Sequence, residues 1–136
     1  MKYFICSFVT PAPQLPSMNF GFPSEQTERI ISVDRVQTNI YETVEHETYI
    51  SLPALLRQKG IAAPHGLVLK SLNSVILLTP KIDVEMDLPQ EKITKLPEIF
   101  TGVFSIFSGG CFLDKTAGNC DLVLLLDPKK IMEKLP

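Results

Sequence analysis

Short apolar runs separated by turn residues dominate the chain from residue 66 to residue 136. Each run is too short for an ordinary helix, and several alternate apolar with polar residues, as strands do. The expected strands are Gly66–Ser71, Val75–Thr79, Ile82–Leu88, Gly102–Phe107, Cys111–Asp114 and Cys120–Asp127. This pattern predicts a small β-barrel or β-sandwich.

The first half continues the pattern with fewer elements. Lys2–Val9 alternates apolar and polar positions, Asn19–Phe22 is a short apolar run, and Thr27–Val36 is rich in β-branched residues. We expect strands there, with a loop over Thr10–Met18. The polar stretch Gln37–Glu47 contains neither glycine nor proline and receives no assignment.

Two segments predict a strand that runs into a short helix. Tyr49–Gly60 carries Pro53 in the expected first turn, and Gly60 is placed to end that helix. Leu124–Lys134 repeats the plan, with Asp127 as the N-cap and Pro128 at the first helical position. The prolines of the chain all fall between apolar runs, which supports these boundaries because proline cannot donate a ladder hydrogen bond.

Length and charge describe an ordinary globular domain. The chain has 136 residues, of which 45% are hydrophobic and 21% charged, and its formal net charge is −2. No basic field exists to hold nucleic acid or an anionic membrane surface. The longest apolar run is far shorter than a membrane span, and the opening residues lack a signal-peptide cleavage site. We expect a cytoplasmic protein.

The cysteines and histidines are weak candidates for catalysis or metal binding. Cys111 and Cys120 flank a turn and could approach each other across a hairpin, although two buried thiols are the more usual outcome in a reducing compartment, as for Cys6. His46 lies in a polar stretch and His65 in a turn, where both rings normally face water. Ser108-Gly-Gly110 and Gly118 precede strand-like residues, so they predict hairpin turns rather than a phosphate loop. No catalytic residue, metal site or cofactor is indicated.

Aromatic residues in the β segments are the remaining candidates for function. If alternation puts Phe104 inside the sheet, then Phe107 points outward. Exposed aromatic residues near a sheet edge can anchor a partner. The candidate partner-binding residues are Phe20, Phe22, Phe107 and Phe112. The alternative is that all of these rings pack internally.

Sequence order adds a resemblance to a known family. Val75–Ile93 has a strand, an acidic-apolar strand and a Leu-Pro-x-x-x-Ile turn; Leu96–Ser105 has a proline-bearing loop before Gly-Val; and Leu122–Met132 closes with Asp-Pro before a helix. Taken together, these pieces resemble the closing half of a CheW-like domain, the adaptor module of bacterial chemotaxis. Upstream, Phe22–Ile31 and Ile50–Leu56 are similar to parts of the family, whereas Gln37–Glu47 lacks its Asn-Leu-Arg-Gly motif.

The resemblance implies a mostly β fold, a two-lobed SH3-like β-barrel with two short helices. It implies one domain over 1–136, with lobe one at about 1–62, lobe two at about 63–136, and chain ends that can cross between lobes. It also implies a non-enzymatic adaptor that uses edge strands and the cleft between lobes. Its partners would be the regulatory domain of a chemotaxis-type histidine kinase, a chemoreceptor tip or a second copy.

A second hypothesis comes from another class of protein. A small β-barrel could instead bind a ligand or catalyse a thiol or carboxylate reaction. A deep pocket that brings together Cys111, Asp114 and His65 would favour this hypothesis. A flat apolar patch would favour the adaptor.

Overall fold

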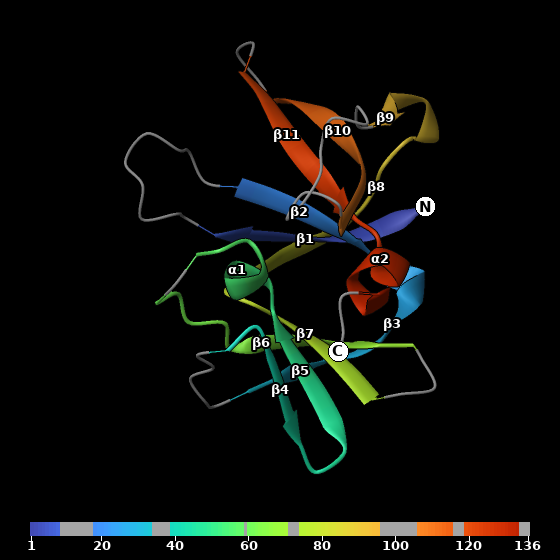
Figure 1. Cartoon of the computed structure of the whole chain (residues 1–136). Coiled ribbons are helices and arrows are strands. Elements are labelled where there is room, and N and C mark those ends of the chain that lie inside the picture. The colour runs from blue at the N-terminus through green and yellow to red at the C-terminus, as the bar shows by residue number, and fades with distance from the viewer. Residues whose placement is uncertain are drawn as a thin grey trace.

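The computed structural model describes residues 1–8, 18–33, 39–58, 60–70, 74–95, 106–115 and 119–133. In these ranges the protein is mostly β, with two sheets and two short α-helices, as predicted (Figure 1). None of the helices in these ranges is long and apolar enough to span a membrane.

The first sheet, here called sheet A, joins strands from both ends of the chain. Its order is β8-β1-β2-β11-β10-β9. Most neighbours are antiparallel, but β11 pairs with β2 in parallel, with Leu124 opposite Phe20. The strands are β1 (Lys2–Phe8), β2 (Met18–Pro23), β8 (Ile82–Asp87), β9 (Ile93–Lys95), β10 (Phe107–Lys115) and β11 (Asn119–Leu126).

The second sheet, sheet B, comes from the middle of the chain. Its order is β3-β6-β7-β5-β4, and β5 and β7 are parallel. Its strands are β3 (Thr27–Ser32), β4 (Tyr41–Val44), β5 (Glu47–Ser51), β6 (His65–Leu69) and β7 (Ser74–Thr79). The division between sheets therefore does not coincide with residue 62. Within the described ranges both sheets are open, because the outermost strands pair on one side only, so the sheets do not close into the predicted β-barrel.

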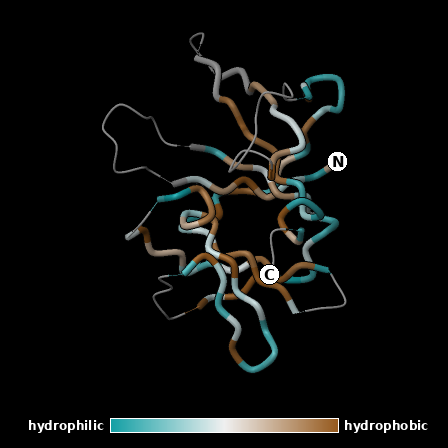
Figure 2. The backbone as a smooth tube through the Cα atoms, viewed as in Figure 1, coloured by the Kyte–Doolittle hydropathy of each residue, from teal (hydrophilic) through white to brown (hydrophobic). Residues whose placement is uncertain are grey.

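Apolar side chains form three buried clusters, one between the sheets and one on the other face of each sheet. Alternation separates them: Leu67 and Leu77 belong to the cluster between the sheets, and Val68 belongs to that of sheet B. We call the first the central cluster. The sheet A cluster contains Tyr3, Ile5, Leu88, Cys111, Val123 and Leu125. Figure 2 shows hydrophobic stretches of both sheets bordering the space between them.

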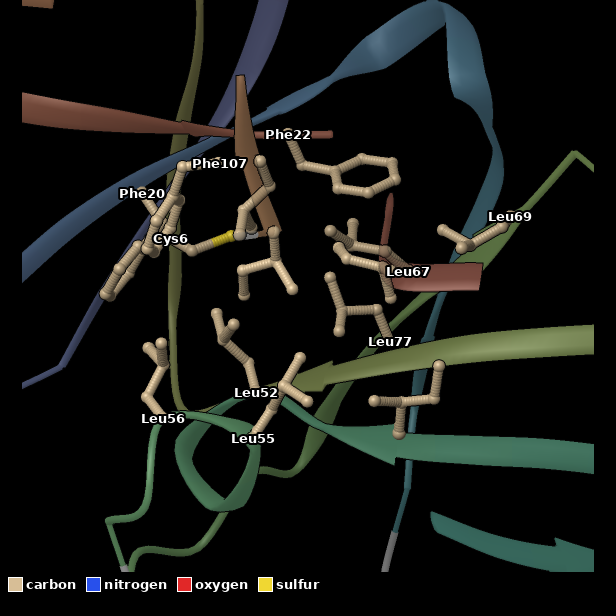
Figure 3. Close-up of a cluster of buried hydrophobic side chains, with 14 of the residues drawn as sticks. Cys6, Phe20, Phe22, Leu52, Leu55, Leu56, Leu67, Leu69, Leu77 and Phe107 are labelled. Carbon is tan, nitrogen blue, oxygen red and sulfur yellow. The ribbon is translucent and has the colours of Figure 1, made fainter. Parts of the chain in front are cut away.

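Side chains from both sheets and both helices fill the central cluster. Figure 3 shows Leu52, Leu55 and Leu56 of the α1 region on one side, with Cys6 and Phe20 of sheet A opposite. Burying one such leucine or phenylalanine contributes about 1.5–3 kcal/mol. The space between the two sheets is therefore a packed core.

Both short helices begin with a side-chain cap. Ser51 Oγ accepts the Ala54 N–H (3.3 Å) at the start of α1 (Leu52–Leu55), and Asp127 Oδ1 accepts the Lys129 N–H (3.0 Å) at the start of α2 (Pro128–Glu133). The Asp127 prediction is confirmed.

The first helix ends earlier than predicted, and not at Gly60. Arg57 has φ 61°, its N–H donates to Ala54 O (2.9 Å), and the Gln58 N–H donates to Pro53 O (2.8 Å). This is a Schellman motif, in which the left-handed residue is usually glycine. Because arginine rather than glycine occupies that position, the sequence does not predict this helix end.

One further local prediction was wrong, and one unassigned stretch is now assigned. Gly109 and Gly110 lie inside β10 and not in a hairpin turn. A Cβ on Gly109 would come within 2.8 Å of Thr94 O in β9, so glycine permits the close approach of that strand. Part of the unassigned stretch Gln37–Glu47 forms β4, which turns through Glu45 and His46 into β5.

Candidate functional site

Three of the four candidate aromatic residues lie in the core. Phe20, Phe22 and Phe107 belong to the central cluster, and the rings of Phe20 and Phe107 stack with centroids 5.9 Å apart (Figure 3). Phe107 is 3% exposed, so the expectation that it points outward is wrong. Phe104 lies outside the described residues.

A β-bulge explains the orientation of Phe107. Phe107 pairs with Leu126, but Gly109 pairs with Leu125, so β10 advances two residues while β11 advances one. The extra residue shifts the alternation. Phe107 therefore faces the central cluster, although strict alternation would place it with Cys111 on the other face of sheet A.

Phe112 is the exposed candidate. Its residue is 59% exposed, and its cross-strand partner Leu122 is 40% exposed. Leu124 lies on the same face of β11 as Leu122 and packs against the central cluster. The apolar face of sheet A thus continues beyond the region opposite sheet B, onto the projecting β10–β11 hairpin at the top of Figure 1. We call Phe112 and Leu122 the hairpin patch.

The hairpin patch adjoins an open strand edge. Strand β9 pairs only with Gly109–Cys111 of β10. Within the described part of the chain, the outer edge of β10 from Phe112 to Lys115 has no neighbouring strand. Unpaired N–H and C=O groups at such an edge can accept a strand from another polypeptide.

The opposite edge of sheet A carries negative charge. Exposed residues of β8 include Asp83, Glu85 and Asp87. Lys81 Nζ lies 3.0 Å from Asp83 Oδ1, and Ser7 Oγ donates to Asp83 Oδ2 at 2.6 Å. Partial burial acts to raise the pKa of Asp83, but the bonds from Ser7 and Lys81 outweigh it and hold that pKa below its ordinary value. Charges of this kind protect an edge from pairing.

The thiols are poorly suited to nucleophilic chemistry. Burial raises the pKa of the Cys6 thiol to about 12, although a hydrogen bond with Thr79 acts to lower it. Cys111 is also a buried free thiol and pairs across the strands with Val123. Both results confirm the expectation of buried thiols. The Cys120 side chain lies outside the described part.

Two groups of the alternative hypothesis, Cys111 and His65, lie in different sheets, and the Asp114 side chain lies outside the described part of the chain. Cys111 belongs to the sheet A cluster, whereas His65 begins β6 in sheet B. His46 is exposed in the β4–β5 turn. In the described ranges no three His, Cys, Asp or Glu side chains are grouped to hold a metal ion.

The overall arrangement is similar to a known structure. The crystal structure of the scaffolding protein TtCheW from Thermoanaerobacter tengcongensis matches with a TM-score of 0.63, over 93% of this chain and 90% of that chain. Sequence identity is 13%, a level at which the likeness establishes the fold alone. No family model and no curated protein matches the sequence. The predicted CheW-like, SH3-like fold is confirmed.

Proposed function

We propose that this chain is a non-enzymatic scaffold of the CheW-like type, an adaptor that binds other proteins in bacterial signal transduction. The observation that carries this proposal is the fold likeness to a scaffolding protein over nearly the full length of both chains. The buried Cys6 thiol, which stays protonated at neutral pH, is in keeping with a binding role.

The hairpin patch is the proposed contact surface. Phe112 offers a large aromatic side chain, Leu122 extends the apolar area, and the open edge of β10 offers backbone hydrogen bonds. A partner strand that pairs with this edge can cover Phe112 with its own apolar side chains. Aromatic anchors of this kind often dominate binding energy. Because Phe20, Phe22 and Phe107 are buried, they support the surface only from within.

The proposed partners follow from the resemblance to the family. They are the regulatory domain of a chemotaxis-type histidine kinase and the tip of a chemoreceptor, with self-association as the third possibility. Such partners would place the protein in the cytoplasm. We propose protein partners rather than nucleic acid or lipid, because the net charge of −2 does not favour binding to polyanions.

Direct binding measurements test this proposal. The purified chain would be titrated with the kinase regulatory domain and the receptor tip of the same organism, and its own association would be followed by analytical ultracentrifugation. We expect Phe112→Asp to weaken the observed interaction about tenfold or more. Its circular dichroism spectrum should be unchanged, because Phe112 is exposed.

Ile30→Asp is the matched control. Ile30 is also an exposed apolar residue, but it lies on β3 in sheet B, away from the hairpin patch. Its substitution should leave binding unchanged. Absence of all three interactions would overturn the adaptor role, and full binding by Phe112→Asp would overturn the proposed surface.

A further inference from the structure

A surface pocket of about 320 Å³ lies where the start of β1, the 3₁₀ turn η1 (Ser24–Gln26) and the start of α2 meet. Figure 1 shows α2 beside the segment that enters β3, below the N-terminus. The volume is near the lower end of the roughly 300–1,000 Å³ typical of ligand pockets. It therefore suits one side chain or a small molecule.

The apolar wall of this pocket is rigid. Tyr3 contributes to the wall and is held within the sheet A cluster, where it is 6% exposed. Pro23 and Pro128 add two rings with restricted backbones. Because Tyr3 and Pro23 are largely buried, only small parts of them reach the pocket, where together with Pro128 they give a bound group an apolar surface to pack against.

Carboxylates from two different elements stand around the wall. Glu25 comes from η1 and Asp127 from the end of sheet A, and both line the pocket. Burial raises the pKa of Tyr3, and the negative charge of Glu25 raises it further, which places that charge within electrostatic reach of the phenol. The cap bond to the Lys129 N–H orients the Asp127 carboxylate.

Two cationic groups also line the pocket, and they differ in effect. The Met1 ammonium is paired with Asp87 at 3.0 Å, so its charge is largely compensated. Lys129 is exposed and lines the pocket from α2. Its ammonium group should repel a bound cation. Removing this positive charge should therefore strengthen cation binding, and this direction can be tested.

We infer that this pocket binds a guanidinium group, as an arginine side chain carries. A guanidinium is planar and weakly hydrated, so it can pack against an apolar wall, and it presents forked N–H donors to two separate carboxylates. An ammonium group is a strongly hydrated point charge and lacks the planar face. The site is separate from the hairpin patch, and testing it requires no adaptor partner.

The test uses small probes on the intact protein. N-acetyl-arginine N-methylamide would be titrated while ¹⁵N–¹H NMR spectra are recorded, with the lysine and citrulline analogues as comparisons. We expect shifts concentrated at Glu25, Gln26 and the start of α2, and binding of the arginine probe at least about fivefold tighter than that of neutral citrulline. Free arginine distinguishes a metabolite site, which would prefer it, from a site for arginine within a polypeptide, which would prefer the capped probe.

Two variants with opposite expected effects on arginine binding make the test specific. Glu25→Gln should weaken arginine binding about fivefold, and Lys129→Gln should strengthen it about twofold. Glu28→Gln is the matched control, because Glu28 is exposed on β3 and does not line the pocket. Equal binding of arginine and citrulline, or weaker binding by Lys129→Gln, would overturn the inference and leave the adaptor proposal standing.

Discussion

The two ends of strand β10 place the same residue type in opposite surroundings. Phe107 stacks on Phe20 in the central cluster, whereas Phe112 lies in solvent on the projecting hairpin. Both belong to the face of sheet A that carries the central cluster. The difference is whether sheet B lies opposite, so the extent of the second sheet, rather than residue type, separates core from contact surface.

The largest expected loss of stability is at Phe107, the buried end of β10. Phe107→Ala would remove a ring that packs in the central cluster, and we expect the free energy of unfolding to fall by about 3–5 kcal/mol. Urea denaturation followed by circular dichroism measures this loss. A loss under about 1 kcal/mol would mean that Phe107 is not a core residue. It would contradict the contrast drawn between Phe107 and Phe112.

A substitution at Gly109, beside the β-bulge of β10, should cause a smaller loss of stability. In Gly109→Ala, the new Cβ would meet the backbone oxygen of Thr94, and we expect a loss of about 1–3 kcal/mol in unfolding free energy. Amide exchange in β9 should become faster, because that strand has to move away. Gly110→Ala is the matched control: its Cβ would meet the Leu122 side chain at 3.2 Å, which can shift, so the loss should be smaller.

The helix cap that follows β11 supports the buried end. The Asp127 N–H donates to Ile106 O (2.8 Å), and α2 inserts Ile131 into the central cluster. Asp127→Ala should lower the free energy of unfolding by about 1 kcal/mol through loss of the cap, measured by thermal denaturation. Asp127→Asn keeps the cap and should be nearly neutral; equal losses in both variants would contradict this role.

The smallest effect is expected at the exposed end. Phe112→Ala should change the free energy of unfolding by no more than about 0.5 kcal/mol, because its ring already contacts water. The same urea denaturation experiment measures it beside Phe107→Ala. A loss above about 1.5 kcal/mol would show that Phe112 is covered within the folded chain and would remove it from the proposed contact surface.

Strand positions were largely predictable because apolar alternation and proline boundaries are local signals. Val75–Thr79 became β7 (Ser74–Thr79), and Ile82–Leu88 became β8 (Ile82–Asp87). The orientation of Phe107 could not be predicted by counting alternation from Phe104, because Ile106, directly before Phe107, does not lie in a strand. Ile106 and Phe107 both enter the central cluster, so the period of two does not hold at this junction.

Other features were missed for equally physical reasons. The β4–β5 turn places Glu45 (φ 50°) and His46 (φ 70°) in the left-handed region, where asparagine and glycine are the usual signal. The guanidinium pocket brings together Tyr3, Glu25 and Asp127, which are far apart in sequence. The pairing of β1 with β2 brings Tyr3 close to the segment of Glu25, and the parallel pairing of β2 with β11 adds Asp127.

That parallel pairing also sets an order of assembly during synthesis. Sheet B uses one continuous stretch, residues 27–79, and its pairings can form once that stretch has left the ribosome. Strand β2 has to wait for β11, translated about a hundred residues later, and closing so long a loop is entropically costly and slow. We therefore expect nascent chains to carry a folded middle and an unfinished sheet A, whose apolar strands stay incompletely paired until β11 has left the ribosome.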